Sequence, residues 1–138
     1  MDNTSLSTGP APSAEELALV AAFVRATNAG ELAALEALFA ADALVNDQLR
    51  NFWGIQEIRA WLEREIVGER VALKVLRVRK HYDAIIATAE ISGEFETPRL
   101  PQPMTVDLHF TLQDARIVRL LVLLARDDTP EPDIRRAP

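Results

Sequence analysis

The sequence predicts an α+β domain, with helices in the first half of the chain and a sheet in the second. From about residue 14 to residue 68, apolar residues recur three and four positions apart, which is the spacing of an amphipathic helix. From Val71 onward, apolar and polar residues alternate with a period of two, as in strands with one buried face. Because helices and strands occupy separate parts of the chain, the α+β class is favoured over an alternating α/β fold.

The first helix is expected to begin after Ser13 and to run to about Ala29. Ser13 and Glu16 form a capping box, in which each side chain bonds the backbone N–H of the other residue. Gly30 follows directly, and glycine is the residue best suited to the left-handed conformation that closes a helix. Both ends of this helix are therefore predicted from its own residues.

Two further helices are expected before the sheet. The second covers roughly residues 31–41, and the third covers about 55–68, where Gly68 ends it. The stretch LVNDQLRNFWG, residues 44–54, connects them and contains Asp47. The apolar residues that support these two helices are Leu32, Leu35, Leu38 and Phe39 in the second, and Ile55, Ile58, Trp61, Leu62 and Ile66 in the third.

Four strands, joined as an antiparallel meander, are expected after the helices. The last of them, IVRLLVLLA, is apolar on both faces. This pattern indicates either a central strand or a strand that packs against a partner, and we favour homodimerisation through the sheet. The four strands cover roughly residues 71–81, 84–96, 104–113 and 116–126.

The composition of the 138-residue chain fits one domain and excludes several functions. The net charge of −6 disfavours a nucleic-acid partner, because phosphate binding needs a basic surface. We find no cysteine, no signal peptide and no apolar run of the ~20 residues that span a membrane, so the cytoplasm is the expected location. The domain is expected to cover 14–126, between a disordered arm (1–13) and a flexible tail (127–138).

Three motifs together resemble those of the nuclear-transport-factor-2-like superfamily, which includes the SnoaL-like polyketide cyclases and the bacterial ketosteroid isomerases. The motifs are FVRATNAGELAALEALFAADALVND, FWGIQEIRAWL and DLHFTL. The resemblance covers about residues 14–126. It implies a cone-shaped, cystatin-like fold, in which a strongly curved antiparallel sheet wraps three N-terminal helices and encloses a small-molecule pocket. Many members of this superfamily are dimers.

The resemblance also implies a site. Asp47 falls where the ketosteroid isomerases carry their catalytic base, and Trp61 falls at a position that lines the steroid pocket. In the same comparison, Phe23 replaces a tyrosine and Leu108 replaces a protonated aspartate, the two groups that donate hydrogen bonds to the developing oxyanion. Asp107 is one residue out of phase and should face the other way. Because one lost oxyanion donor costs about 10²–10³ in rate, efficient steroid isomerisation is not expected.

Asp47 is thus the candidate general base of an isomerase, cyclase or hydrolase that acts on an apolar or aromatic molecule. A base must reach the proton that it abstracts, so Asp47 has this role only if it points into a cavity. Two alternatives stay open: Asp47 bonds only the backbone of its own turn, or the domain is a non-catalytic ligand-binding or dimerisation module. The expected ligand-binding residues are Phe23, Phe39, Trp53, Trp61, Leu108 and Phe110.

No cofactor or metal is expected. The chain has no glycine-rich phosphate loop. Asp107 and His109 lie two apart on one face of a strand, but zinc needs at least three protein ligands and no third residue stands at a suitable spacing. His109 is more simply explained as a residue of the sheet surface or of a dimer contact.

Overall fold

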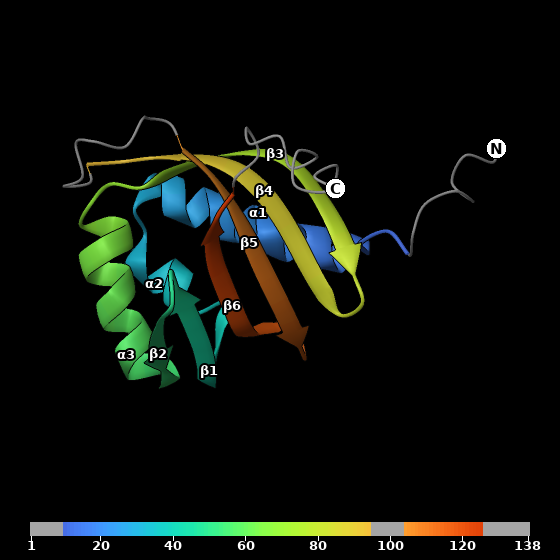
Figure 1. Cartoon of the computed structure of the whole chain (residues 1–138). Coiled ribbons are helices and arrows are strands. Elements are labelled where there is room, and N and C mark those ends of the chain that lie inside the picture. The colour runs from blue at the N-terminus through green and yellow to red at the C-terminus, as the bar shows by residue number, and fades with distance from the viewer. Residues whose placement is uncertain (1–9, 95–103, 126–138) are drawn as a thin grey trace, which may run out of the picture.

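The computed structural model describes residues 10–94 and 104–125, and its elements follow the predicted order (Figure 1). Helices come first, strands dominate the second half, and a π-helical segment continues the last helix. The elements are α1 (Ala14–Ala29), α2 (Leu32–Glu36), β1 (Phe39–Asp47), β2 (Arg50–Trp53), α3 (Gly54–Trp61), η2 (Leu62–Val67), β3 (Ala72–His81), β4 (Ala84–Ser92), β5 (Met104–Gln113) and β6 (Arg116–Leu124).

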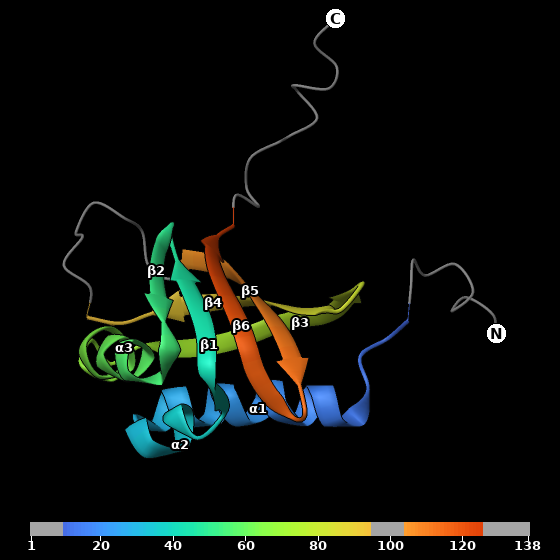
Figure 2. The same ribbon diagram turned by 90° about the horizontal axis from the view of Figure 1, so that it is seen from below.

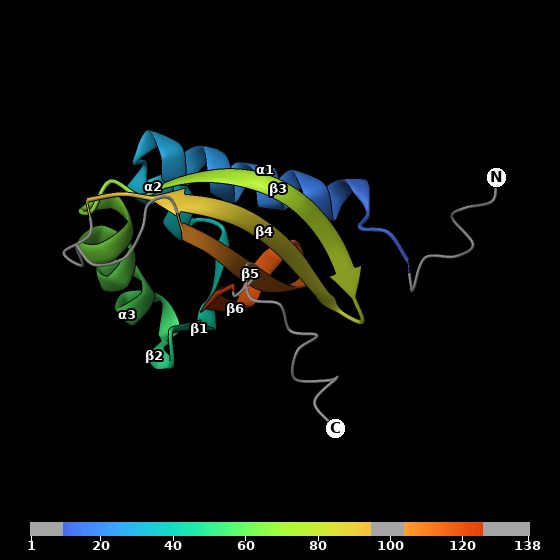
Figure 3. The same ribbon diagram turned by 45° about the horizontal axis from the view of Figure 1, so that its top comes forward.

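Within the described residues, the strands form one six-stranded sheet in the order β2-β1-β6-β5-β4-β3. The sheet is strongly curved. Figure 2 shows α1 lying across one face of it, with α3 beside β2, and Figure 3 shows β3 and β4 bending over α1. The predicted α+β class, with helices packed in a curved sheet, is confirmed.

Helix α1 has the ends that its sequence predicts. Glu16 N donates to Ser13 Oγ at 3.0 Å, and Ser13 N donates to Glu16 Oε1 at 2.8 Å, which completes the capping box. Gly30 closes the helix in the left-handed region, with φ of 67°. These fixed ends set the orientation of the helix, so that Phe23 and Thr27, one turn apart, are both buried beneath the sheet.

The prediction of the second helix is wrong beyond residue 36. Helix α2 ends at Glu36, and residues 39–47 form strand β1 where helix was expected to residue 41. The alanine and leucine residues of this segment favour helix locally. However, β1 pairs with β2 on one side and with β6 on the other, which buries Ala43 and Val45 completely. Tertiary pairing overrides the local preference here. A wholly antiparallel sheet was expected, but the pairing of β1 with β6 is parallel, so the sheet is mixed.

The stretch LVNDQLRNFWG is a β-hairpin rather than an irregular connection. Asp47, the last residue of β1, pairs with Arg50, the first residue of β2. Gln48 and Leu49 form the turn, with φ of 54° and 73°. Positive φ at both central residues is what a tight two-residue hairpin requires, because it matches the twist of the strands. The hairpin therefore holds Asp47 at a defined position at the end of a buried strand.

The core lies between α1 and the inner face of the sheet. Phe23 of α1 packs edge-on against Phe110 of β5, with ring centroids 5.3 Å apart, and against Phe39 of β1 at 6.4 Å. Such edge-to-face contacts are favoured by the aromatic quadrupole. This aromatic cluster fills one part of the space inside the curved sheet.

Strand β6 is central, since it lies between β1 and β5. This position is one of the two explanations for its two apolar faces. Leu120 and Val122 point inward and are buried. On the outer face, Leu121 is half-buried and Leu123 is 37% exposed. Partner packing on that outer face stays a prediction.

The predicted flanking segments are described only in part. Residues 1–9 of the arm, residues 97–103 between the second and third predicted strands, and the tail at 127–138 lie outside the described residues. Residues 10–13 precede α1 without regular secondary structure. In the described ranges, no helix has both the length and the apolar character needed to cross a membrane.

Candidate active site

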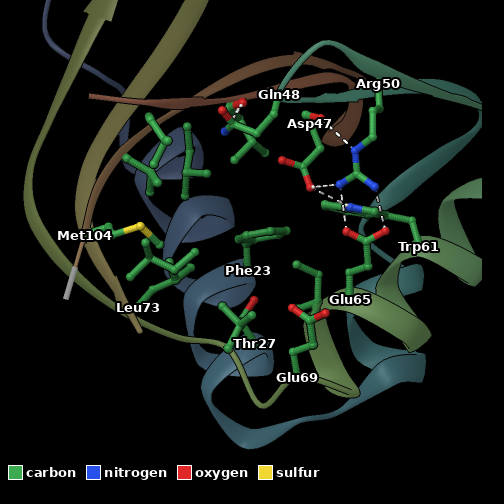
Figure 4. Close-up of a pocket in the computed structure, with 17 residues that line it drawn as sticks. Phe23, Thr27, Asp47, Gln48, Arg50, Trp61, Glu65, Glu69, Leu73 and Met104 are labelled. Carbon is green, nitrogen blue, oxygen red and sulfur yellow. Dashed lines mark hydrogen bonds and ion pairs between the residues drawn. The ribbon is translucent and has the colours of Figure 1, made fainter. Parts of the chain in front are cut away.

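A cavity of about 270 Å³ lies between α1, η2 and the inner face of the sheet (Figure 4). Most of its wall is hydrocarbon. Asp47, Arg50 and Glu65 gather where the β1–β2 hairpin meets η2, and Glu69 lies nearer to Thr27 (Figure 4). An apolar cavity of ~150 Å³ holds one benzene molecule, so this one accommodates a two-ring molecule. The lining residues are Phe23, Thr27, Asp47, Gln48, Arg50, Trp61, Glu65, Ile66, Glu69, Val71, Leu73, Ile91, Met104, Val106, Leu108, Val122 and Leu124.

The carboxylate of Asp47 stands at the polar end of this cavity, with its side chain 15% exposed. One oxygen, Oδ2, accepts hydrogen bonds from Trp61 Nε1 at 3.0 Å and from Arg50 Nη2 at 3.1 Å. The other oxygen, Oδ1, has no hydrogen-bond partner within residues 10–94 and 104–125, and Figure 4 shows it directed into the cavity. The carboxylate is thus held by one oxygen and presents the other to an occupant of the cavity.

This arrangement differs from that of an ordinary turn aspartate. Such a residue bonds the backbone N–H groups of its own turn, whereas the Asp47 side chain bonds an indole and a guanidinium. The local turn is closed by another residue, since Leu49 N donates to Asn46 Oδ1 at 3.1 Å. The geometry therefore supports the cavity-facing interpretation of Asp47 over the turn interpretation.

Arg50 and Glu65 form a bidentate ion pair beside Asp47. Arg50 Nη2 lies 2.7 Å from Glu65 Oε1, and Nη1 lies 2.9 Å from Oε2. The hydrogen bonds from Arg50 lower the pKa of the Glu65 carboxyl, against the opposing effect of burial, and those to Glu65 raise the pKa of Arg50. Because Arg50 Nε also donates to the backbone oxygen of Asp47 at 3.3 Å, the guanidinium braces the hairpin, Asp47 and η2 together.

The π-helical turn of η2 helps to position Glu65. Residues 62–67 are wound more widely than an α-helix, and Glu65 and Ile66 from this segment line the cavity. Single π-turns inside helices occur often at functional sites. Gly68 follows, and a Cβ atom there would lie 2.5 Å from the carbonyl oxygen of Arg64. The tight close of η2 at this point therefore requires glycine, which explains the predicted helix end.

Three of the six predicted ligand-binding residues line the cavity: Phe23, Trp61 and Leu108. Contact with a ligand stays a prediction for each of them. Trp61 is 1% exposed, stacks on Phe52 with ring centroids 5.9 Å apart, and donates its indole N–H to Asp47. It is therefore both a wall of the cavity and a support for the carboxylate.

The other three do not line this cavity, which corrects the prediction. Phe39 and Phe110 are fully packed on the far side of Phe23 from the open space, where they serve as core. Trp53 is the last residue of β2 and is 60% exposed. Because successive side chains of a strand point to opposite faces, Trp53 points away from the core, while the neighbouring Phe52 packs against the core.

The two expected oxyanion donors are absent from the cavity wall, as the sequence indicated. Phe23 and Leu108 present hydrocarbon there. Asp107 lies on the outer face of the sheet, where its Oδ1 accepts a hydrogen bond of 2.6 Å from Thr88 Oγ1. His109 shares that outer face. Among the described residues, no three histidine, aspartate or glutamate side chains converge as metal ligands would.

Five polar residues of the wall were not predicted: Thr27, Gln48, Arg50, Glu65 and Glu69. Thr27 was accessible to sequence reasoning, because a residue four after Phe23 shares its helix face. Arg50 would have followed from a hairpin across residues 44–53, which places it opposite Asp47. Glu65 and Glu69 carry no local signal, since their position depends on the π-turn.

Residues 20–120 match the family model of the SnoaL-like domain. A polyketide-cyclase-like protein of Sinorhizobium meliloti is 27% identical, with a TM-score of 0.68 over 76% of this chain and 93% of its own. A Catenulispora acidiphila protein with a ketosteroid isomerase-like fold, in complex with trimethylamine, is 19% identical, with a TM-score of 0.66 over 78% and 85%. A search of curated proteins finds no match.

A cystatin-fold protein of Novosphingobium aromaticivorans is 14% identical, with a TM-score of 0.64 over 78% of this chain and 96% of its own. At such identities, this protein and the Catenulispora acidiphila protein show the fold alone. Together, the comparisons confirm the predicted resemblance and the cone-shaped, cystatin-like fold.

Proposed function

Since the chain belongs to the SnoaL-like domain family, we propose that it is an acid–base enzyme of the isomerase, cyclase or hydrolase type, with Asp47 as its general base. The substrate is a small apolar or aromatic molecule bound in the cavity beneath the sheet. One observation carries this proposal: Asp47 Oδ2 is fixed by Trp61 and Arg50, while Oδ1 faces the cavity and has no hydrogen-bond partner among the described residues. A proton acceptor needs that combination of fixed position and free lone pair.

The absence of oxyanion donors at Phe23 and Leu108 restricts the types of reaction that the cavity can support. An enolate formed here gains no hydrogen bond from either position, so a weakly acidic ketone is a poor substrate. We propose that the carbon acid is already activated, for example by an adjacent aromatic ring, or that the base activates a water molecule. Both reactions need a base and an apolar binding surface rather than an oxyanion hole.

The charges around the cavity favour neutral or cationic substrates over anions. Three carboxylates, from Asp47, Glu65 and Glu69, line the wall beside one guanidinium, from Arg50. An anionic substrate entering this space would meet net repulsion in a partly dry environment, where screening is weak. Binding of trimethylamine by the Catenulispora acidiphila protein is in keeping with this preference.

The test is carbon–hydrogen exchange in 2-tetralone, whose C1 protons are acidified by both a ketone and a ring. Asp47 takes a proton from C1, the bonding electrons pass into the enolate, and a deuteron from D₂O is returned. We expect Asp47→Asn to lower the enzyme-catalysed exchange by about 10²–10⁴, because asparagine retains an acceptor for Arg50 or Trp61 but is no base. Asp83→Asn, in the β3–β4 turn, is the matched control.

Binding of 2-tetralone to the same variants separates the two function classes. A catalytic base predicts that Asp47→Asn still binds the ketone while its exchange is lost. Equal exchange in wild type and Asp47→Asn, with binding retained, would instead support the alternative of a non-catalytic ligand-binding module. The missing oxyanion donors are the observation that favours this second function.

We also propose that the protein is a homodimer that associates through the outer face of the sheet. This face presents Leu121 and the partly exposed Leu123 on β6, next to Asp107 and His109 on β5. Arg79 donates to Thr88 on the same face at 3.3 Å, so cationic, anionic and apolar groups lie within one patch. A two-fold dimer brings identical patches together, and a patch of mixed character can be complementary to itself.

A further inference from the structure

Thr27 places a buried polar group in the cavity wall that the proposed acid–base chemistry does not use. The residue lies on α1, is 2% exposed and lines the cavity one helical turn after Phe23. In a helix, a threonine hydroxyl commonly bonds the backbone carbonyl three or four residues earlier. The Thr27 hydroxyl makes no such bond: Oγ1 is buried and has no hydrogen-bond partner in the described part of the chain.

An unpaired buried hydroxyl is uncommon, because folding removes it from water without returning a hydrogen bond. Among the described residues, Thr27 Oγ1 is the one buried side-chain oxygen or nitrogen in this state. Its other wall neighbours on the sheet, such as Leu73 and Met104, are apolar and offer no side-chain partner. The missing partner is therefore expected to come from the occupant of the cavity.

The position of the Thr27 hydroxyl relative to Asp47 restricts which substrates can bind in the cavity. Figure 4 shows the Thr27 hydroxyl directed toward the interior of the cavity, on the opposite side of the Phe23 ring from Asp47. The aromatic face of Phe23 lies between the two polar positions. A substrate that reaches both must be apolar in its middle and polar at the end remote from the reacting carbon.

We propose that Thr27 is a specificity-determining residue that binds a neutral oxygen function of the substrate, a hydroxyl or a carbonyl, at the end remote from Asp47. Because the hydroxyl of threonine both donates and accepts, it can serve either group. This inference rests on the proposed function, since the ligand is the substrate of the same cavity. It narrows the substrate class to apolar, ring-containing molecules with an oxygen substituent distal to the carbon from which Asp47 takes the proton.

The test compares two probes of one shape, naphthalene and 2-naphthol, by titration calorimetry against wild type, Thr27→Val and Thr27→Ser. Valine matches threonine in shape but lacks the hydroxyl, whereas serine keeps it. We expect the preference for 2-naphthol over naphthalene to fall by about 3–10-fold in Thr27→Val, the size of one neutral hydrogen bond. Naphthalene affinity should stay within about twofold in both variants, and Thr27→Ser should keep the wild-type preference.

The ligand-free protein offers a second readout. Removal of an unsatisfied hydroxyl should raise the melting temperature of Thr27→Val by roughly 2–8 °C. A lower melting temperature together with an unchanged 2-naphthol preference would overturn the inference, because the hydroxyl would then have a structural partner. If Thr27→Val does not fold, Thr27→Ala removes the same hydroxyl and carries the comparison.

Two further outcomes separate this inference from the proposed function. A 2-naphthol preference that is lost in Asp47→Asn but kept in Thr27→Val would overturn the role of Thr27 while leaving the cavity as the binding site. Failure of both probes to bind wild type would overturn the proposed cavity function and this inference together.

Discussion

The two faces of strands β4, β5 and β6 differ sharply, although they are built from alternate residues of the same segments. On the inner face, Val106, Leu108 and Val122 are buried and line the cavity. On the outer face, Thr88 donates to Asp107, and His109 lies next along β5. A one-residue step along β5 therefore separates the cavity wall from the outer face of the sheet.

Strand phase, more than residue type, decides which side chains of these strands reach the cavity. Asp107 and Leu108 are neighbours, yet only Leu108 lines the cavity. A carboxylate therefore stands within one residue of the position where an oxyanion donor is expected, but on the other side of the sheet. The chemistry of the cavity is left to residues outside these strands: Asp47, Arg50, Glu65 and Thr27.

The largest expected effect is the difference in folding stability between substitutions on the inner face and on the outer face of β5. Phe110 is fully buried against Phe23, whereas Thr111 points to the outer face. We expect Phe110→Ala to lower the free energy of unfolding by about 3–5 kcal/mol and Thr111→Ala to change it by less than about 0.5 kcal/mol. Urea unfolding of both variants measures this difference. Similar losses in the two variants would contradict the assignment of faces.

The next effect concerns association through the outer face. In the proposed two-fold dimer, Leu121→Arg brings like charges into the same interface and should weaken dimerisation by roughly 100-fold, from a repulsion of several kcal/mol. Sedimentation equilibrium of wild type and variant gives the dissociation constants. Leu17→Arg, an exposed leucine on α1, is the control. A wild-type protein that is monomeric at high concentration would end the dimer proposal.

A smaller effect should appear as a pH dependence from the outer face. Burial lowers the pKa of the His109 imidazole below 6.5, with further lowering by Arg79 and His81, and the opposing attraction of Asp107 is weaker. Below pH 6.5 the unfolded chain takes up a proton that folded His109 resists, so stability falls as the pH falls toward the lowered pKa. His109→Gln should flatten the melting temperature between pH 7 and pH 5. An unchanged slope in this variant would contradict that account.

Much of the fold could be predicted, because its signals are local. The capping box at Ser13 and Glu16 fixes the start of α1, and the period of two fixes β3 to β6. Strand β1 could not be predicted, since its alanine and leucine residues favour helix and only pairing with β6, over 70 residues later, makes them a strand. The β1–β2 hairpin could not be predicted either, because its turn at Gln48 and Leu49 has no glycine or asparagine at its centre.

The sequence indicated the lining of the cavity where a single motif supplies the residue, and it did not where several segments meet. Asp47, Phe23, Trp61 and Leu108 line the cavity as the family resemblance implied. Trp53 was misplaced, because aromatic character alone does not reveal which side of an edge strand a residue occupies. The position of Glu65 in the wall depends on a π-helical turn for which the sequence carries no recognisable signal.

The central claim, that a ligand binds in the cavity beside Asp47, can be tested with the two tryptophans of the chain. The Trp61 indole N–H bonds Asp47 at the cavity wall, while Trp53 is exposed on β2. In ¹H–¹⁵N NMR spectra, with Trp53→Phe to assign the two indole signals, titration with naphthalene should shift the Trp61 signal and leave the Trp53 signal in place. A shift of Trp53 alone, or binding that moves neither signal, would contradict the account.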